Sequence, residues 1–441
     1  MVKLGNYKIF LSAVICTLIT ASLLVSSNVY AVGSSGFELA TNSARSLAKA
    51  NAVVADPDEP ATIAFNPAGL TKLEGNQVST SSSFIALSTS YDGKNGGVSE
   101  DSATHIATVP STFISLSTPI KDFKVGLGVN APFGLMTQYS STGNFKYTAN
   151  FNEIKTIGYN VAGAYQLTPM VSVGVGWTYL DTSLKQVGKL NSNFITSTVI
   201  PGTTGLADAP FELDVNGQGT GWNLGLLLTP DDKNSIGVFY RSRIRASYRG
   251  EVSVDTLQGA VMQGVFGGSS FKTSADTDIT FPDNVTIGYN HKMNDRWDVE
   301  ADLGWTNWSV FDKVDILFGT TNSVLNGLEP VNEDFRDVFS LQLGTSYSLN
   351  KEWTLNGGYF FYERAANKAN YSNAIPDGDR HSLAIGLEYN TKSYSLDLAY
   401  IFSIFPSESI NNNVGSASGA VVDGDYQSFG HIFSIGVTHK F

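Results

Sequence analysis

The chain has 441 residues, a formal net charge of −12 and an aromatic fraction of 12%, and it contains 43 glycines. A chain this acidic is poorly suited to nucleic acid, because binding it requires a net basic surface. After residue 25 no apolar segment approaches the roughly 20 residues that a membrane helix needs. The composition therefore excludes a helical membrane protein but not a β-barrel with aromatic girdles and tight turns.

The first 31 residues follow the pattern of a secretory signal peptide. Lys3 and Lys8 precede an apolar run at residues 9–25, and Ala31 closes a short segment that fits a signal peptidase site. The alternative is a single-pass anchor, for which this interrupted run is marginal in length. Cleavage after Ala31 removes two lysines and no acid, so the net charge becomes −14, and it removes the only cysteine, Cys16. Disulfide bonds then contribute nothing to the mature protein.

Residues 36–73 lack the alternation of a β-strand. Ala44, Leu47 and Ala48 recur at helical spacing, and the pairs Asp56-Pro57 and Asn66-Pro67 follow them. The segment is too apolar for a disordered linker and too short to form a core of its own. We therefore expect residues 32–75 to form a compact helical hatch that plugs the lumen of a barrel.

From residue 76 to the C-terminus, segments with a period of two residues recur. At residues 297–305 an apolar face with tryptophan at both ends alternates with an acidic row, Asp298, Glu300 and Asp302, as in a girdle strand. Fourteen such segments give roughly 26 residues per strand, whereas a soluble sandwich turns every ~8–12 residues. An even number suits a closed bacterial barrel, so we expect residues 76–441 to be an all-β transmembrane antiparallel barrel. Its strands are expected to start near Val78, Thr112, Lys124, Ile154, Val171, Gly219, Ser235, Asp278, Trp297, Phe335, Trp353, Asp379, Tyr394 and Ser428.

The last eleven residues predict the closing strand of this barrel. Phe433, Ile435, Val437 and the terminal Phe441 are apolar, and the residues between them are mostly small or polar. A terminal aromatic residue after such alternation resembles the signal that the bacterial barrel-assembly machinery reads. The alternative, a terminal strand of a soluble sandwich, fits the rest of the chain less well.

Two regions together resemble the FadL/TodX family of outer-membrane transporters of hydrophobic compounds. They are the N-terminal segment, with Gly36-Phe37, Ala55-Asp56 and Asn66-Pro67-Ala68, and the stretch Ala131-Pro132-Phe133-Gly134-Leu135 in the expected third strand. The resemblance covers essentially the whole mature chain. It implies a fourteen-stranded barrel with a hatch, which captures ligand outside, passes it to an internal site and releases it sideways into the membrane through a kinked third strand.

The resemblance also assigns gating residues. Pro132, Phe133 and Gly134 would form the kink, and Asn66, Pro67 and Ala68 would face it; proline donates no ladder hydrogen bond and glycine packs poorly in a strand. The alternative is an ordinary turn and an ordinary strand end. In the family the Gly-Phe pair lies at the mature N-terminus and reaches the internal site. Cleavage after Ala31 leaves four residues before Gly36, so either the cut is later or this detail does not transfer to Phe37.

Two connections are long enough to be functional loops, residues 186–217 and residues 253–275. The first mixes apolar residues with glycine and proline, and the second has a near-helical apolar pattern. The resemblance implies that they form an apolar groove that receives ligand first, whereas the alternative is a simple cap on the barrel mouth. The apolar residues are Phe194, Ile195, Val199, Ile200 and Phe211 in the first loop and Val254, Leu257, Val261 and Val265 in the second.

Arg241, Arg243 and Arg245 alternate along the expected seventh strand, which predicts that they share one face. Cations that point into a lumen must be paired or hydrated. One hypothesis pairs them with the acidic row across the lumen. The other lets one arginine hold a carboxylate headgroup through a charge-assisted hydrogen bond. The residues expected on the opposite face are Tyr240, Ile244 and Tyr248.

Other chemistry is scarce in the sequence. The five histidines show no metal-ligand spacing, there is no nucleophile elbow, and the glycine-rich residues 217–221 open a strand and not a helix. We therefore expect no metal, no cofactor and no enzyme activity, although a barrel lipid hydrolase remains open because its serine and histidine need only meet in space. A surface adhesin or receptor is a further alternative.

The resulting hypothesis is a passive uptake channel in the cell outer membrane, for long-chain fatty acids first and aromatic hydrocarbons second. The expected partners are the hydrophobic ligand, outer-membrane lipids and lipopolysaccharide around the barrel, and the barrel-assembly machinery during biogenesis. The expected oligomeric state is a monomer.

Overall fold

The computed structural model describes residues 36–39, 41–326 and 331–441. The predicted signal peptide and its cleavage site lie outside these residues. No helix in the described ranges combines the length and the apolarity that crossing a bilayer requires.

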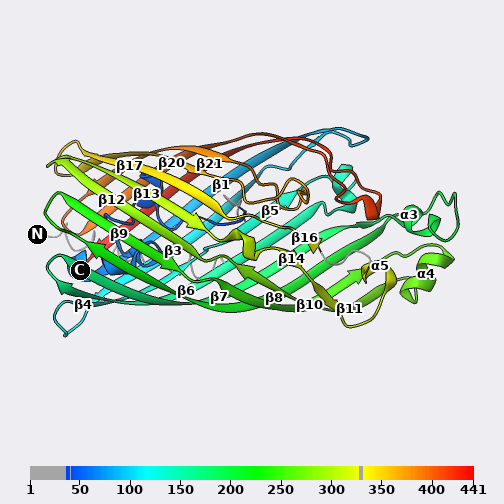
Figure 1. Cartoon of the computed structure of the whole chain (residues 1–441), viewed down its shortest axis with the longest axis horizontal. Helices are drawn as coiled ribbons and strands as arrows, with labels where there is room; N and C mark the ends of the chain where they lie inside the picture. Colours follow the sequence, from blue (N-terminus) through cyan, green and yellow to red (C-terminus); the bar gives the residue numbers. More distant parts are fainter. Residues whose placement is uncertain (1–35, 40, 327–330) are drawn as a thin grey trace, which may run out of the picture.

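Antiparallel strands close into a barrel (Figure 1). The first strand, β1 (Gln77–Gly93), pairs with the last, β21 (Gly424–Lys440), along its whole length, from Gln77 opposite Lys440 to Gly93 opposite Gly424. This seam leaves neither terminal strand with an open edge, as a membrane-spanning sheet requires. The predicted fold class is confirmed.

All fourteen predicted wall strands are present, and four of them are interrupted. In order they are β1; β3 (His105–Ser117); β4 (Phe123–Asn130) with β5 (Gly134–Gln138); β6 (Phe151–Thr168); β7 (Val171–Leu190); β8 (Ala209–Leu228); β9 (Asn234–Arg241) with β10 (Ile244–Val254); β11 (Phe271–Phe281) with β12 (Asn284–Asn294); β13 (Trp297–Thr306) with β15 (Ile316–Phe318); β17 (Val338–Ser348); β18 (Trp353–Tyr362); β19 (Arg380–Asn390); β20 (Tyr394–Ile410); and β21.

Short elements lie in the connections. Figure 1 shows α3, α4 and α5 at one end of the barrel, opposite the end that holds the C-terminus. We call the end with these helices the outer end. The short elements are β2 (Glu100–Asp101), η3 (Asn144–Tyr147), α3 (Ser192–Ser197), α4 (Ala260–Phe266), η4 (Trp308–Val310), β14 (Lys313–Val314), α5 (Ser323–Asn326), β16 (Val331–Asn332) and η5 (Ser416–Ser418).

The predicted loop at residues 186–217 is too long. β7 and β8 stay paired as far as Leu190 opposite Ala209, and β10 and β11 stay paired as far as Val254 opposite Phe271. The outward faces of these strands turn from apolar to charged; Lys185 of β7, for example, pairs with Glu212 of β8 at 2.7 Å. Periodicity of apolar residues ends at the membrane boundary, so it underestimates strands that continue into water.

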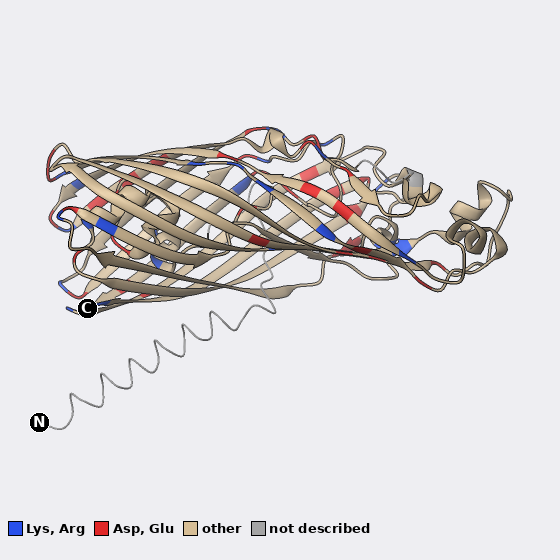
Figure 2. Ribbon diagram, turned by 90° about the horizontal axis from the view of Figure 1, so that it is seen from below, with Lys and Arg blue, Asp and Glu red and all other residues tan. Residues whose placement is uncertain are grey.

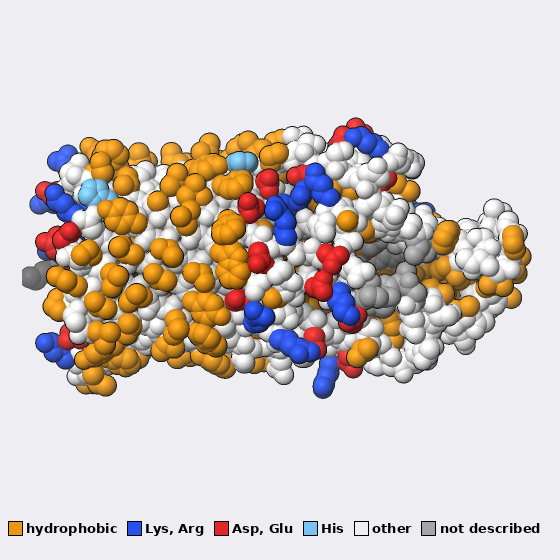
Figure 3. All heavy atoms as spheres, in the orientation of Figure 1, with side chains coloured by type: hydrophobic (Ala, Val, Ile, Leu, Met, Phe, Trp, Pro, Cys, Tyr) orange, Lys and Arg blue, Asp and Glu red, His pale blue; other side chains and the backbone are white. Residues whose placement is uncertain are grey.

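The outer surface separates into two zones. Figure 3 shows apolar side chains gathered over the part of the barrel near the C-terminal end, and acidic and basic side chains over the part toward the outer helices. Figure 2, seen from another side, shows further acidic and basic residues in the turns at the end that holds the C-terminus. An apolar zone flanked by charged rims is the surface expected of a barrel that spans a bilayer.

The segment at residues 41–73 packs inside the barrel. It contains α2 (Ala44–Ala48), η1 (Pro60–Ala64) and η2 (Pro67–Lys72). Helix α2 contacts β1 and β18–β21, and η2 contacts β4 and β6–β8 on the other side. Glycines make room for it; a Cβ at Gly386 would lie 2.3 Å from that of Ala48. We call residues 36–73 the hatch.

Carboxylates of the wall hold the hatch. Asp302 accepts hydrogen bonds from the backbone N–H groups of Val53 and Val54 at 3.1 and 3.2 Å, and Glu300 accepts one from Ala55 at 2.7 Å. Buried Arg45 of the hatch pairs with three carboxylates, which are Glu388 at 2.9 Å, Asp397 at 3.2 Å and Asp58 at 3.6 Å. Glu300 and Asp302 of the acidic row therefore bind the hatch backbone, and the three arginines pair with other acids, so the hypothesis that the row pairs with the arginines is wrong.

Candidate functional site

The third strand breaks where the sequence predicts a kink. β4 pairs with β3 as far as Val129 opposite Thr112, whereas β5 pairs with β6 alone among the described strands. Between β4 and β5 lies Pro132, which has no N–H to donate to a ladder. The wall therefore has a gap in its hydrogen bonding between β5 and the outer half of β3. We call this place the wall gap.

Backbone hydrogen bonds join the hatch to the kink. Leu39 donates its N–H to the carbonyl of Pro132 at 2.9 Å, and Gly134 donates its N–H to the carbonyl of Phe37 at 2.9 Å. Glu38 and Phe133 form an isolated antiparallel bridge between these two bonds. The polar groups that the kink takes out of the barrel ladder thus find partners on the hatch, as buried backbone groups must.

Asn66, Pro67 and Ala68 pack elsewhere, so the prediction that they face the kink is wrong. A Cβ at Gly225 of β8 would lie 2.1 Å from the Asn66 Oδ1, and one at Gly174 of β7 would lie 2.4 Å from the Ala68 nitrogen. The Asn66 Nδ2 donates to the carbonyls of Val54 and Leu226 at 2.9 and 3.1 Å. The two glycines offer the space that such close approach of backbones requires. The start of η2 therefore packs against β7 and β8.

An aromatic cluster surrounds the start of the hatch. Phe37 is fully buried, with ring centroids 4.7 Å from Trp308, 5.2 Å from Phe311, 5.9 Å from Phe281 and 6.3 Å from Phe133. Phe37 thus lies inside the barrel, and its role in binding ligand stays a prediction. Sequence reasoning missed the partners, although the aromatic spacing at residues 308–311, directly after the ninth strand, was a signal that could have found two of them.

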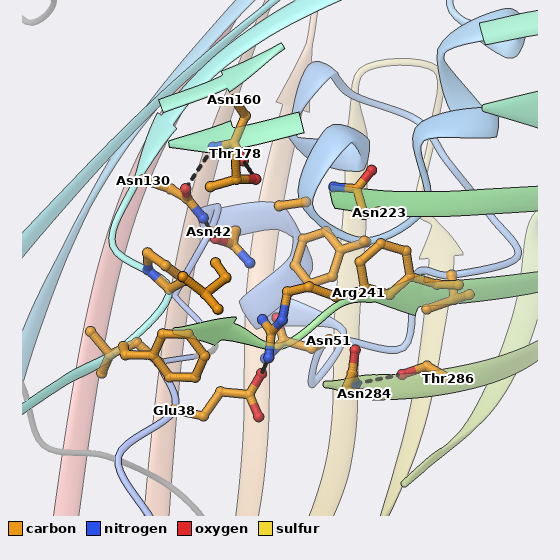
Figure 4. Close-up of a pocket in the computed structure, with 18 of the residues that line it drawn as sticks. Glu38, Asn42, Asn51, Asn130, Asn160, Thr178, Asn223, Arg241, Asn284 and Thr286 are labelled. Carbon is orange, nitrogen blue, oxygen red and sulfur yellow. Dashed lines mark hydrogen bonds and ion pairs between the residues drawn. The ribbon is translucent and has the colours of Figure 1, made fainter. Parts of the chain in front are cut away.

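A cavity of about 100 Å³ lies between the hatch and the kink (Figure 4). One wall is a chain of hydrogen bonds, in which Thr178 donates to Asn160 at 2.7 Å, Asn160 to Asn130 at 2.9 Å and Asn130 to Asn42 of the hatch at 2.6 Å. We call this space the amide chamber. Its other lining residues are Glu38, Leu39, Asn51, Val54, Ala64, Phe65, Pro132, Phe133, Asn223, Phe239, Arg241, Ile244, Asn284, Thr286, Gln342 and Tyr362.

The three arginines of the seventh strand do not share a face. Arg241 lines the amide chamber and pairs with Glu38 at 2.7 Å (Figure 4). The side chains of Arg243 and Arg245 are 56% and 71% exposed, and they pair with Asp283 at 3.1 Å and Asp278 at 2.6 Å.

A β-bulge explains this difference. Arg241 lies opposite Asn223 on β8, whereas Ser247 lies opposite Gln218. Six residue steps on the seventh strand therefore match five on β8, and the one extra residue switches the alternation. As a result Ile244 and Tyr248, expected on the face opposite the arginines, are buried inside the barrel.

Arg380, which sequence reasoning missed, is a cation buried in the lumen. It is 6% exposed, its Nε donates to the Oγ atoms of Ser382 and Ser403 at 3.2 Å each, and its guanidinium lies 4.7 and 5.8 Å from the ring centroids of Phe360 and Phe405. No carboxylate oxygen in the described residues lies within 4.0 Å of its nitrogens. The alternation of the twelfth strand, extended by two residues, was a signal that could have placed it inside.

The apolar residues of the second loop lie at the outer end. Val254 and Leu257 are buried in the core, whereas Val261 and Val265 lie on α4 and are half-buried. The near-helical spacing is thus explained by a short helix at residues 260–266. A role of these four residues in ligand capture stays a prediction.

Comparisons with known proteins agree with this architecture. The family described as outer membrane protein transport protein (OMPP1/FadL/TodX) matches residues 23–441. Outer membrane protein P1 of Haemophilus influenzae is 25% identical over 423 residues, which cover 86% of this chain and 89% of that protein. The long-chain fatty acid transport protein of Escherichia coli K12 is 25% identical over 427 residues, which cover 89% and 92%.

Solved structures share the fold. A FadL homologue of Pseudomonas aeruginosa matches with a TM-score of 0.81 at 21% identity, over 92% of this chain and all of that one. The toluene transporter TodX of P. putida matches with a TM-score of 0.69 at 18% identity, over 89% of this chain and 98% of that one.

Proposed function

Since this chain belongs to the OMPP1/FadL/TodX family of outer membrane transport proteins, we propose that it is a passive channel for long-chain fatty acids that releases them sideways through the wall gap. The coarser function, transport of hydrophobic compounds across the outer membrane, is that of the family. The choice of fatty acid and the lateral exit are the parts that we propose.

The buried guanidinium of Arg380 carries the proposal. An unpaired charge inside a barrel is costly, and an anion that enters the lumen lowers this cost. The two flanking phenylalanine rings leave an apolar surface beside the cation, and the planar guanidinium matches a carboxylate with two parallel hydrogen bonds. A carboxylate attached to an apolar chain fits both features, whereas a pure hydrocarbon uses only the rings.

The lateral exit is supported by the wall gap and by its contact with the hatch. Opening the wall at β5 breaks no ladder bonds to β3 among the described strands. It requires that the hatch release Pro132 and Gly134, and that the carbonyl of Gln138 release the N–H of Ala103, which donates to it at 2.8 Å. These three backbone hydrogen bonds are few compared with the full ladders elsewhere in the barrel. The hatch is thus placed to hold the exit closed until ligand displaces it.

Binding titrations of Arg380→Ala test the ligand class. Hexadecanoic acid should lose affinity by roughly 10- to 100-fold, which corresponds to ~1.5–3 kcal/mol for a hydrogen bond to a charged group, while hexadecane binding should hardly change. Arg380→Lys should restore part of the loss. Arg243→Ala and Arg245→Ala are matched controls, because their side chains lie outside the barrel. Equal affinity of Arg380→Ala and the wild type for the acid would refute the proposal.

The earlier headgroup hypothesis now applies to Arg241 alone, since it is the member of the three that faces the lumen. Its Nη2 is already paired with Glu38, so we expect Arg241→Ala to weaken acid binding less than Arg380→Ala does. The same titration with hexadecanoic acid measures both variants.

Aromatic hydrocarbons are the second candidate ligand class. The cluster of Phe37, Phe133, Phe281, Trp308 and Phe311 favours them, because edge-to-face contacts with such rings stabilise an aromatic guest. An alkylbenzene that binds more tightly than hexadecanoic acid to the wild type would favour this alternative.

A further inference from the structure

Arg241 lies in a row of three polar side chains on the barrel wall. In the antiparallel ladders it is opposite Asn223 of β8 on one side and opposite Asn284 of β12 on the other. All three line the amide chamber, and Figure 4 shows Arg241 reaching from this wall toward Glu38 of the hatch. The row is thus a cation flanked by two amides, and these are groups that can bind a carboxylate.

The closed channel uses this row only in part. The Nη2 of Arg241 pairs with Glu38 at 2.7 Å, but its Nε is buried without a hydrogen-bond partner among the described residues. The Oδ1 atoms of Asn223 and Asn284 are also buried, and they too lack a partner there. Native proteins leave few buried polar atoms unpaired, so these atoms indicate a guest. A carboxylate can bind a guanidinium through two parallel N–H groups, and the Nε of Arg241 offers one of them.

Either end of the two amides can face the chamber. An amide carries a carbonyl that accepts and an NH₂ group that donates, and rotation about the last side-chain bond exchanges them. The Nδ2 of Asn284 donates to the Oγ1 of Thr286 at 3.2 Å, and a hydroxyl can donate in return, so this bond survives the exchange. Asn223 and Asn284 can therefore donate to an anion on Arg241, whereas a hydrocarbon there leaves the whole row unsatisfied.

The chamber has room for a headgroup and not for a long alkyl chain. Its volume is about 100 Å³, whereas pockets that hold drug-sized ligands measure ~300–1,000 Å³. Pro132 and Phe133 of the kink line the chamber, so the chamber borders the wall gap. A long-chain acid with its carboxylate on Arg241 therefore has its chain outside the chamber, and the wall gap lies next to it.

Glu38 links this row to the closed exit. It forms the isolated bridge with Phe133, between the two backbone hydrogen bonds that join the hatch to the kink. Its carboxylate is the same chemical group as the headgroup of a fatty acid, so the two compete for Arg241. A ligand that takes Arg241 releases Glu38 and thereby weakens the hold of the hatch on the kink.

We propose that Arg241, Asn223 and Asn284 form a second carboxylate site, which Glu38 of the hatch occupies in the closed channel and from which the headgroup of a long-chain fatty acid displaces it. Displacement loosens the hatch from the kink, so the acid itself opens the lateral exit. The proposal rests on the proposed function, because it takes a fatty acid as the ligand and the wall gap as the exit. No molecule has to contact Arg241 and Arg380 at the same time, because the two sites act in turn.

Titrations in an Arg380→Ala background test the second site, because this change removes the proposed first one. There Glu38→Gln should bind hexadecanoic acid about 3- to 10-fold more tightly, the size of one net hydrogen bond, since an amide competes less well for Arg241 than a carboxylate does. Adding Arg241→Met should abolish this gain, and the affinity for hexadecane should stay unchanged throughout. If Arg241→Met does not fold, as judged by heat-modifiable migration, Arg241→Gln replaces it with the same expected loss.

Asp278→Asn is the matched control. It makes the same carboxylate-to-amide change in the ion pair with Arg245, whose side chain lies outside the barrel. It should leave the affinity for hexadecanoic acid unchanged. A gain as large as that of Glu38→Gln would refute the proposal, because the effect would not come from the chamber.

Hydrogen exchange reports whether the second site opens the exit. The N–H of Gly134 donates to the carbonyl of Phe37 in the closed channel. Hexadecanoic acid should speed its exchange in the wild type, whereas hexadecane should not, and Glu38→Gln should exchange faster even without ligand. Exchange that responds to neither the acid nor Glu38→Gln would refute the coupling between the site and the kink.

The outcomes separate the two proposals. The second site is refuted if Glu38→Gln brings no gain for hexadecanoic acid, or if the gain persists without Arg241 or extends equally to hexadecane. In that case a loss of acid affinity in Arg380→Ala still leaves the proposed function standing. If Arg380→Ala binds the acid as tightly as the wild type, the proposed anchor fails, and the comparison of Glu38→Gln with and without Arg241 still decides the second site.

Discussion

Glu38 of the hatch and Phe133 of the broken third strand lie opposite each other in an isolated antiparallel bridge, and Arg241 contacts both. Its Nη2 pairs with Glu38 at 2.7 Å, and its guanidinium lies 5.0 Å from the Phe133 ring centroid. The contact joins three parts that are distant in sequence, namely the start of the hatch, the kink and the bulge of the seventh strand. Movement of any one of them is therefore coupled to the wall gap.

A disulfide between positions 38 and 133 should lock the exit. The hydrogen bonds flank this pair, so the two Cα atoms should lie about 4.5 Å apart, which is within the range that a disulfide spans. We expect Glu38→Cys/Phe133→Cys to block fatty acid uptake when oxidised and to regain the uptake of the reduced form when a reductant is added. Uptake of a radiolabelled fatty acid by cells measures this. The single-cysteine variants are the controls, and an oxidised double variant that transports as well as its reduced form would contradict a gating role.

Removing the hatch should open the lumen to water. Residues 36–73 contact strands on opposite sides of the barrel, so their deletion should leave a folded barrel that passes small polar solutes. Single-channel conductance in planar bilayers should show large steady openings that the wild type lacks. A deletion variant that folds and stays closed would show that the hatch is not the plug.

The stability of the hatch should depend on pH through Glu59. This residue is buried, its carboxyl accepts a hydrogen bond from Ser43, and burial raises its pKa to about 8 despite the nearby Arg45. Because the pKa is higher in the folded than in the unfolded chain, folding binds a proton, and the stabilisation is complete below about pH 4.5 and is lost as the pH rises through about 8.

Thermal unfolding in detergent between pH 4.5 and 8.5 measures this effect. We expect the wild type to lose stability across the range relative to Glu59→Gln, whose neutral amide does not titrate. Parallel curves for the two proteins would mean that Glu59 is ionised throughout.

Phe441 should matter for assembly. The terminal residue exchanges backbone hydrogen bonds with Asn76 at 2.9 and 3.2 Å, next to the seam between β1 and β21, and its ring is exposed. If Phe441 is part of the assembly signal, Phe441→Ser should lower the yield of folded, heat-modifiable barrel in the outer membrane. Refolding into micelles in vitro should be nearly unchanged, because the exposed side chain has little contact with the folded barrel. An unchanged yield in cells would remove the support for an assembly signal.

The sequence alone predicted the barrel and the break in its third strand. In a bilayer each strand must show one apolar face, so alternation in stretches such as residues 297–305 is dictated by the solvent on the two sides of the wall. The kink was predictable for a similar reason, because Pro132 cannot join a ladder whatever surrounds it. Both properties are local, and they persist in any fold that places these residues in a strand.

Only the tertiary structure decided which charges meet. One extra residue after Arg241 turns Arg243 and Arg245 outward, and the alternation of residue types gives no sign of a bulge. The acidic row looked like a partner for those arginines, but the hatch backbone reaches it first, through contacts between residues about 250 positions apart. Arg380, by contrast, has no carboxylate oxygen within 4.0 Å of its nitrogens in the described part of the chain. Pairing inside a closed barrel depends on strand register and on what fills the lumen, and neither is encoded in the pattern of a single strand.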